Sequence, residues 1–409
     1  MKTNRAFKYE LDPNRGQLLL FARHAGTARF AYNWGLARKK EALEREEKVP
    51  SAIDLHRELN ALKKTDFPWM YEVSKCAPQE ALRNLDVAFR NFWNGRRKGR
   101  RTGFPKFKKK GIHDSFRFST GAIHVFERHV QLPKLGRIRV KEPICASLRD
   151  IANGAGKILS ATVSRVADRW YVSFTVEHET SDPVPVQGPV VGVDLGINCF
   201  AVLSDGTEVY APKPLQKMLV RLQRLSKQLS RKKKGAMNRK KAAMRVARLY
   251  RRITNIRNDF LHKLSTELAK TKSVIVFESL NVKGMVRNRH LARHIADAGW
   301  SRFREMMQYK ASWYGSTLVT APAFFPSTKT CSVCGNIQDM PLKERTFECA
   351  NCGAIMSRDL NAALNLEKLY TGSSPGINAC GEEGSGSRKH YAVKPFSVKQ
   401  EVTPVDICP

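Results

Sequence analysis

The sequence predicts a multidomain protein of the α/β class, and three observations lead to that prediction. The chain has 409 residues, enough for two or three domains of ordinary size. Its first half combines helical spacing with short segments of period two, whereas buried strands and long amphipathic helices follow Pro189. Between the two halves, residues 181–189 read SDPVPVQGP, which is typical of a linker.

The first expected element is a strand over residues 5–11, where apolar and polar side chains alternate. Residues 12–14, Asp-Pro-Asn, then signal a turn and the start of a helix. Helical spacing continues to about Asn94 and is clearest after Pro78, where apolar residues recur every three or four positions. This stretch predicts a helical subdomain.

A basic connector follows over residues 96–111, RRKGRRTGFPKFKKKG, whose Gly and Pro residues break the helical pattern. Beyond it, segments of period two between short turns predict an antiparallel β module that ends near Glu179. The clearest of these segments are 116–118, 137–140 and 169–176.

The second half opens with two apolar strands, PVVGVDLGINCFAVLSDG and SVIVFESLN. The long segment between them keeps helical spacing on both sides of Gly235, which predicts a helical hairpin over residues 214–268. After Tyr370, the Gly- and Ser-rich sequence has no apolar period, so residues 371–409 are expected to be a disordered tail.

The charge balance predicts a polyanionic partner, since 72 Lys and Arg face 37 Asp and Glu, a net charge of +35. No acidic residue occurs from Pro214 to Asn258. A merely solvated basic face is the alternative, but solvated helices usually mix both signs, so we favour contact with nucleic-acid phosphates. The candidate contacts in the hairpin and the connector are Arg231, Lys232, Lys233, Arg245, Arg248, Arg252, Lys106 and Lys108.

The cysteines and the N-terminus bear on the cellular compartment. The chain contains 9 Cys, an odd number, which suits metal ligation in a reducing compartment better than disulfides. Cys76, Cys145 and Cys199 are expected to be buried thiols. No apolar run approaches the length of a membrane span, and the start MKTNRAFKYELDPN lacks the apolar region of a signal peptide. We therefore expect a cytoplasmic protein.

The strongest local signal is a double CxxC motif formed by Cys331, Cys334, Cys349 and Cys352, with a glycine directly after each pair. Paired CxxC turns can aim four thiolates at one Zn²⁺ ion, and such a closed tetrahedral site is structural and not catalytic. A redox pair is the alternative, but the sequence lacks a thioredoxin-like context. The motif therefore predicts a zinc ribbon.

Three carboxylates are candidates for a second metal site. Asp194 and Glu278 each end an apolar strand, where an acid is awkward as packing and natural as a metal ligand. Asp359 follows the second CxxC pair at an expected helix start, where it could instead be an N-cap. Together they could hold two Mg²⁺ ions for phosphodiester hydrolysis. The sequence has no Walker, GxSxG or Rossmann GxGxxG motif, so the commonest rival chemistries are excluded.

Taken in order, GVDLGIN, VFESLN, CSVCG, CANCG and SRDLNAALNLE resemble the transposon-encoded TnpB proteins. The segments RAFKYELDPN, RFAYNWGLA, QEALRNLDVAF and GFPKFKKK also resemble that family, which leaves only the tail outside. The resemblance implies an RNA-guided DNA endonuclease related to the type V CRISPR effectors, with a RuvC nuclease domain of RNase H-like fold. It also implies a β-barrel wedge domain interrupted by a helical recognition domain.

The resemblance implies a role for each candidate residue. Asp194, Glu278 and Asp359 would be the catalytic RuvC ligands for Mg²⁺, and the four cysteines would hold Zn²⁺ in an inserted ribbon. The implied domains are wedge 1–12 and 103–187, recognition 13–102, RuvC 188–326 and 354–370, ribbon 327–353 and tail 371–409.

Such proteins read a short motif beside the target, while base pairing to the guide reads the rest. On the helix after Pro78, Lys75 and Gln79 could reach base edges and Arg83 could grip phosphate, although all three could be ordinary helix surface. The aromatic residues near basic ones could stack on bases or pack, and packing is favoured for the two tryptophans. They are Phe104, Phe107, Trp300, Tyr309, Trp313 and Tyr314.

The hypothesis is thus a monomer that holds a guide RNA and cleaves double-stranded target DNA, acting at the nucleoid and linked to transposon DNA recombination. One alternative is a guide-free transposase or nuclease that acts on DNA ends with the same carboxylates. The other is an RNA-directed DNA-binding repressor, against which the intact carboxylate triad argues.

Overall fold

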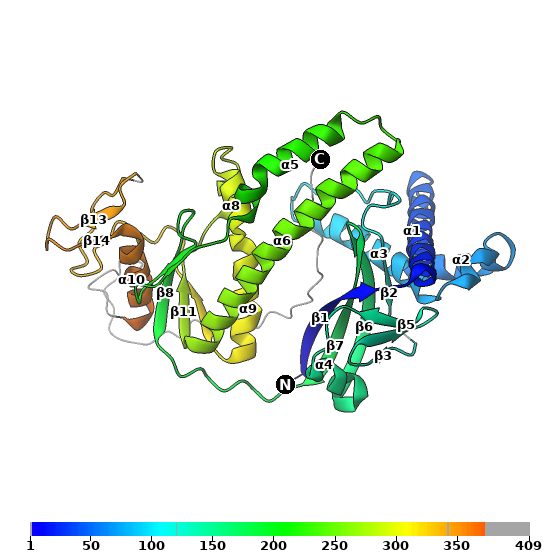
Figure 1. The fold of residues 1–409 in the computed structure, drawn as a ribbon, viewed down its shortest axis with the longest axis horizontal. Coiled ribbons are helices and arrows are strands. Elements are labelled where there is room, and N and C mark those ends of the chain that lie inside the picture. Colours follow the sequence, from blue (N-terminus) through cyan, green and yellow to red (C-terminus); the bar gives the residue numbers. More distant parts are fainter. Residues whose placement is uncertain (1, 120, 342, 373–409) are drawn as a thin grey trace.

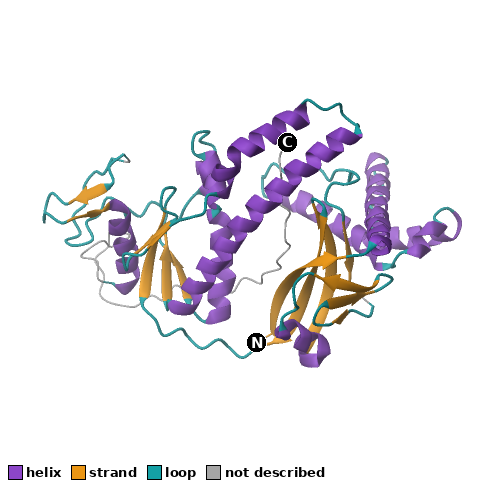
Figure 2. Ribbon diagram, viewed as in Figure 1, coloured by secondary structure: helices purple, strands orange, loops and turns teal. Residues whose placement is uncertain are grey.

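The computed structural model describes residues 2–119, 121–341 and 343–372, which form two lobes joined by residues 180–189 (Figure 1). Each lobe is built on its own β-sheet with helices packed against it (Figure 2). A long pair of helices, α5 and α6, projects from the C-terminal lobe and reaches over the N-terminal sheet (Figure 1).

The N-terminal lobe contains a seven-stranded antiparallel sheet of order β2-β6-β7-β1-β5-β4-β3. The first strand is central, because β1 pairs with β7 from Lys2 opposite Glu179 to Leu11 opposite Trp170. The described pairings leave β2 and β3 as edges, so they form an open sheet and not a closed barrel. The strands are β1 Lys2–Asp12, β2 Ser115–Phe118, β3 His124–Val125, β4 His129–Leu132, β5 Gly136–Val140, β6 Gly156–Val166 and β7 Arg169–Glu179.

The helical subdomain lies between β1 and β2. It contains α1 (Arg15–Glu44), α2 (Ala52–Thr65), a 3-10 turn (Pro68–Glu72) and α3 (Cys76–Arg97). The expected helix start is confirmed, because Asn14 caps α1 by accepting a hydrogen bond from the Gln17 backbone N–H at 2.8 Å. A Cβ at Gly35 of α1 would lie 2.7 Å from Leu82 of α3, so this glycine permits the close packing of the two helices. A short helix, α4 (Ala146–Asp150), and a π-helical turn (Ile151–Ala155) precede β6.

The C-terminal lobe contains a five-stranded sheet of order β10-β9-β8-β11-β12, in which β8, β11 and β12 are parallel. The strands are β8 Val190–Leu195, β9 Ala201–Leu203, β10 Glu208–Val209, β11 Val274–Phe277 and β12 Thr317–Thr320. Both faces of β11 are buried: Ile275 and Phe277 pack in the core with α6 and α9, whereas Val274 and Val276 pack with Leu366 of α10. Continuous apolar strands such as VIVF are expected where helices cover both faces of a parallel sheet.

The expected helical hairpin is confirmed, with Gly235 at its turn in a left-handed conformation (φ 88°). Its arms are α5 (Pro214–Ser230) and α6 (Met237–Thr271). The remaining elements are α7 (Val282–Met285), α8 (Ala292–Ala298), α9 (Trp300–Tyr314), β13 (Thr346–Glu348), β14 (Ile355–Ser357) and α10 (Arg358–Thr371).

The two lobes touch at specific side chains. The guanidinium of Arg5 in β1 lies over the Trp313 ring of α9, 4.7 Å from its centroid. Arg248 and Arg251 of α6 donate to the carboxylate of Asp168, at the turn between β6 and β7, at 2.9 and 2.6 Å. These contacts hold β1 against α9 and the middle of α6 against the turn between β6 and β7.

The structure corrects one expectation about the cysteines and describes almost none of the expected tail. Cys76 and Cys199 are buried as predicted, but Cys145 is exposed, because it lies at the surface where the chain enters α4. The predicted disordered tail falls almost wholly on residues 373–409, outside the described residues.

Within the described residues, none of the helices has the length and apolar character needed to cross a membrane.

Candidate functional site

Two of the predicted carboxylates lie side by side at the carboxyl ends of neighbouring parallel strands. Val193 of β8 pairs in register with Phe277 of β11, so Asp194 and Glu278 follow one step later on adjacent strands. The apolar sequence of both strands buries them in the sheet, and this places the first polar residue of each at the sheet edge. Ligand sites in open α/β sheets are usually built at this edge.

The third carboxylate comes from α10, which packs directly on β8. A Cβ at Gly192 would lie 1.9 Å from the carbonyl oxygen of Ala363, so only glycine allows the helix to approach this strand so closely. The helix N-cap is Ser357, so the alternative that Asp359 is merely an N-cap is wrong. Asp359 lies in the first helical turn, and its charge is felt at Asp194.

The electrostatics of this cluster are unfavourable for three bare carboxylates. Asp194 is only 8% exposed, and its pKa is raised to about 7 by burial, then by the negative charges of Asp359 and Glu278. Burial also raises the pKa of Glu278. Arg358 opposes the shift at Asp194 and lies 3.3 Å from the Asp359 carboxylate. A group of acids that repel one another, one of them buried, is what a divalent cation would stabilise.

The carboxylates and the cysteines offer two different kinds of metal ligand. Among the described residues, the metal-ligating side chains whose ligand atoms all lie within 4.8 Å of one another are the four cysteines. Three carboxylates contributed by two strands and one helix could instead hold two ions about 3.5 to 4 Å apart. Hard carboxylate oxygens are the ligands that Mg²⁺ prefers, so the donor set fits that ion.

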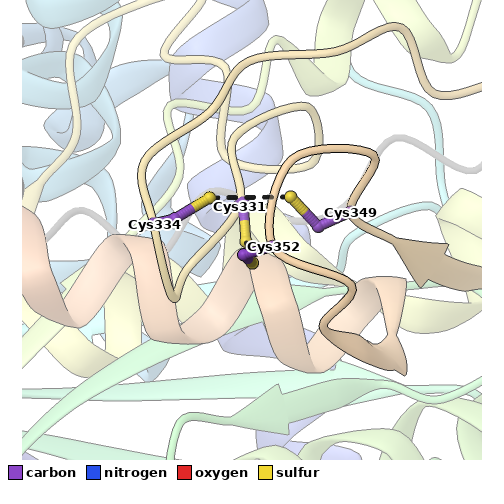
Figure 3. Close-up of side chains that lie close together, drawn as sticks. All are labelled: Cys331, Cys334, Cys349 and Cys352. Carbon is purple, nitrogen blue, oxygen red and sulfur yellow. Dashed lines mark hydrogen bonds between the residues drawn. The ribbon is translucent and has the colours of Figure 1, made fainter.

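The four cysteines converge from two matching turns, as Figure 3 shows. The sulfur atoms of Cys331 and Cys352 are 3.7 Å apart, and those of Cys334 and Cys349 are 3.6 Å apart. In each turn the glycine after the CxxC pair has a positive φ and donates its N–H to the carbonyl of the first cysteine at 2.9 Å. We call the segment from Ser327 to Ser357, with both turns and strands β13 and β14, the cysteine ribbon.

Two thiols of the ribbon have a lowered pKa, which favours the thiolate form. Hydrogen bonds from the backbone near Asn336 and from the Asn351 side chain lower the pKa of Cys334 to about 6. The pKa of Cys349 is also lowered, by backbone hydrogen bonds, whereas the neighbouring sulfurs raise the pKa of Cys352. Thiolate is the metal-binding form, and four sulfurs at these separations match the closed tetrahedral shell of structural Zn²⁺.

The predicted phosphate contacts lie on exposed surface, but two of them are already paired. Arg248 is bound to Asp168, and Arg83 of α3 is bound to the buried carboxylate of Glu80 at 2.7 Å. Lys75 is exposed at the start of α3, and Gln79 is half-buried one turn later. The other candidates are exposed in the hairpin and the connector: Arg231, Lys232, Lys233, Arg245, Arg252, Lys106 and Lys108.

The aromatic residues mostly pack. Trp300 is 3% exposed, and Trp313 lies between Tyr309 and Arg5, so packing is confirmed for both tryptophans. Phe104 packs against Phe89 and Phe92 at 5.3 Å. Phe107 remains 48% exposed beside Lys40, and it is the connector residue best placed to meet a base.

Sequence reasoning missed several polar residues that support the site. Glu80 is 5% exposed and accepts hydrogen bonds from Arg83 and, at 2.8 Å, from Ser119, which ties the start of α3 to the sheet. On α10, Asn361 and Asn365 are buried and bonded to the cysteine ribbon. The motif SRDLNAALNLE contains the signal, because two asparagines four apart on a helix share one face.

Comparison with protein families gives three matches along the chain. Residues 173–289 match OrfB_IS605, described as "Probable transposase", and residues 300–366 match "Cas12f1-like, TNB domain", the region that contains the four cysteines. Residues 1–48 match a model described as a helix-turn-helix domain. In this structure that segment is a strand followed by the single helix α1, so its description does not fit the observed geometry.

Similar proteins span nearly the whole chain. A Streptomyces pristinaespiralis protein named "Putative RNA-guided DNA endonuclease" is 36% identical over 405 residues, covering 98% of this chain and 96% of that protein. The Escherichia coli K12 protein InsQ, with the same descriptive name, is 32% identical over 93% of this chain and 95% of its own length. Among solved structures, a Cas12f1 chain bound to guide RNA and target DNA has a TM-score of 0.52 at 15% identity, over 85% of this chain and 82% of that chain, a likeness of fold.

Proposed function

Because the chain belongs to the TnpB family of RNA-guided DNA endonucleases, we propose that it binds a transposon-derived guide RNA and cleaves target DNA beside a short flanking motif. The observation that carries this proposal is the convergence of Asp194, Glu278 and Asp359 from two adjacent parallel strands and one helix. Carboxylates from separate elements, crowded at a sheet edge, support phosphodiester hydrolysis better than packing.

We assign the C-terminal sheet and its helices to a RuvC domain of RNase H-like fold, as the family implies. In this proposal Asp194, Glu278 and Asp359 hold two Mg²⁺ ions. When bound, such ions supply a water of lowered pKa and charge stabilisation for the leaving 3′ oxygen. Burial of Asp194 and the fixed strand register hold the carboxylates in place before DNA arrives, and the cysteine ribbon would hold Zn²⁺ as a structural ion.

The nucleic-acid contacts follow from the basic surfaces. The hairpin α5–α6, free of acidic residues up to Asn258, would hold guide RNA through its phosphates. The start of α3, with Lys75 and Gln79, would read the flanking motif in the DNA duplex, and base pairing to the guide would read the rest. Arg83 is held by Glu80, so we propose that it fixes the helix start as well as contacting phosphate.

We also propose the domain limits expected from the sequence, a monomeric state, and action on DNA at the nucleoid in the cytoplasm. A role in transposon DNA recombination belongs to the same proposal.

The first test is the RNA that stays bound when the protein is purified from its host through a high-salt wash. We expect one abundant noncoding species that ends in a variable segment. A guide with a new variable segment should then move the cut to a matching duplex, in a reaction that needs Mg²⁺ and stops in Asp194→Ala, which still binds DNA.

Other outcomes identify the alternatives. Cleavage or strand transfer without RNA would favour the guide-free transposase or nuclease. Guided binding without cleavage at any Mg²⁺ concentration would favour the repressor. Cleavage by D194A at the wild-type rate would contradict the assigned carboxylates.

A further inference from the structure

Helix α10 carries two buried asparagines, Asn361 and Asn365, whose side chains the proposed reaction does not use. Their exposed fractions are 0% and 4%. They lie one turn apart, so they share one face of the helix, and Asp359 lies at its start. Buried amides are costly unless they are hydrogen-bonded, so their partners indicate what this face is for.

The hydrogen bonds of these amides reach the first turn of the cysteine ribbon. Asn361 accepts from the Ser332 backbone N–H at 2.8 Å and donates to the Thr330 carbonyl at 2.7 Å. Asn365 donates to the carbonyls of Ser327 and Thr330 at 2.8 and 2.6 Å. Thr330 and Ser332 flank Cys331, so the two amides form hydrogen bonds with the backbone on both sides of a predicted zinc ligand.

The start of the same helix is held by another part of the ribbon. Strand β14 ends at Ser357 and continues without a loop into α10. The Arg358 backbone N–H donates to the Arg345 carbonyl at 2.8 Å, and its guanidinium donates to the Glu344 carbonyl at 3.0 Å. Asp359 therefore sits between two attachments to the ribbon: β14 and Arg358 before it, and Asn361 and Asn365 after it.

We propose that Asn361 and Asn365 are positioning residues that couple the folded cysteine ribbon to the active-site carboxylate Asp359. In this arrangement the ribbon's turn around Cys331 sets the position of the first turn of α10, and so the distance of Asp359 from Asp194. The inference rests on the proposed function, in which Asp359 holds a catalytic cation. It adds a role for the ribbon beyond its own folding.

The test uses the full chain with its guide RNA and the variant Asn361→Leu, which keeps the side-chain size but removes both hydrogen bonds. Four quantities are measured: zinc per chain, affinity for target DNA, Mn²⁺ binding by calorimetry, and the Mg²⁺ concentration for half-maximal cleavage. We expect zinc content and DNA affinity to match the wild type, Mn²⁺ binding to weaken, and the required Mg²⁺ to rise about tenfold. High Mg²⁺ should restore much of the rate.

A matched control is Gln338→Leu, which also removes two hydrogen bonds between a side-chain amide and the backbone, to the Glu348 carbonyl at 2.6 Å and from the Ala350 N–H at 3.0 Å, but within the ribbon and away from α10. It should keep the wild-type Mg²⁺ requirement. If Asn361→Leu does not fold, Asn365→Ser replaces it, because this milder change removes the donors to Ser327 and Thr330 while keeping Asn361 in place.

A wild-type Mg²⁺ requirement in the α10 variant would overturn the coupling, and so would an equal rise in the Gln338 control. Loss of zinc from the α10 variant would also overturn it, because the amides would then serve the ribbon itself. The variant Asp359→Asn distinguishes failure of the coupling from failure of the proposed function. If D359N cleaves normally, the assigned carboxylate is wrong; if D359N is inactive and N361L is normal, only the coupling fails.

Discussion

Asp194, a carboxylate proposed to act in catalysis, lies in surroundings that disfavour its charged form. The side chain ends a buried strand, and its neighbours include two further acids. Burial of a charge near like charges costs free energy, and the raised pKa expresses that cost. The position is thus better explained by cation binding than by stability of the polypeptide.

Asp194→Asn should therefore stabilise the protein in Mg²⁺-free buffer at pH 8 while it abolishes cleavage. The substitution removes a buried negative charge and keeps the side-chain size, so we expect a gain on the order of 2 kcal/mol in the free energy of unfolding. Denaturant unfolding measures it. Asp205→Asn is the control, because Asp205 is paired with Lys272 at 2.7 Å and its loss should not stabilise. A less stable D194N protein would contradict this explanation.

The buried Lys310 should make the free energy of unfolding depend on pH. The residue is 4% exposed, and its ammonium donates to the His262 carbonyl and to the hydroxyls of Ser265 and Thr266, each at 2.7 Å. Burial lowers its pKa from 10.5 to about 8. Between these values the unfolded chain holds a proton that the folded protein has lost, so this residue makes stability rise with pH.

The measurement is the difference in unfolding free energy between the wild type and Lys310→Met from pH 7.5 to 9.5. That difference should grow by about 2 kcal/mol in favour of the wild type as pH rises. Lys263→Met, at an exposed lysine of the same lobe, should show little change. A pH-independent difference for Lys310→Met would show that its pKa is not shifted.

At the scale of elements, the site depends on how closely α10 approaches β8. The helix supplies Asp359, and the strand supplies Asp194, so the packing of backbone on backbone at Gly192 limits how close the two carboxylates can come. Gly192 does not have a positive φ. Glycine is therefore required at this position because there is no room for a side chain, and not because the backbone has an unusual conformation.

Gly192→Ala should separate the two elements. The new methyl group would overlap the Ala363 carbonyl, so we expect a loss of about 2 to 4 kcal/mol in stability and a large fall in cleavage rate. Thermal unfolding and cleavage at saturating Mg²⁺ measure the two effects. Gly103→Ala is the control, since a Cβ there meets nothing within 4 Å. Equal stability of the two variants would show that α10 can shift without cost.

At the scale of the whole molecule, the basic hairpin is held to the N-terminal sheet by an acid. Asp168 binds both Arg248 and Arg251, so it occupies arginines in the part of the surface expected to meet phosphate. Phosphate and Asp168 would compete for the same guanidinium groups.

Asp168→Asn should therefore strengthen RNA binding about two- to fivefold at 150 mM salt and steepen its salt dependence, because the freed arginines can contact additional phosphates. Binding titrations over a range of salt concentrations measure both. Asp339→Asn makes the same charge change on the ribbon, where the side chain is 93% exposed, and should have a smaller effect. Equal effects of the two variants would mean that net charge alone is responsible.

The sequence by itself determined the elements and the chemistry they carry. Local patterns predicted the strand ending at Asp194, the strand before Glu278, the hairpin around Gly235 and the four-cysteine motif, because each depends on the spacing of neighbouring residues. The family, too, was evident from short motifs in order. Even so, the sequence placed Cys145 in the interior, because a lone cysteine carries no local signal of its exposure.

Only the tertiary structure decided which groups face one another. The strand register brought Asp194 next to Glu278, close packing at Gly192 brought α10 and its Asp359 to them, and Asn361 and Asn365 joined that helix to the cysteine ribbon. Contacts between residues tens to more than a hundred positions apart depend on the packing of whole elements. No local period in the sequence specifies that packing.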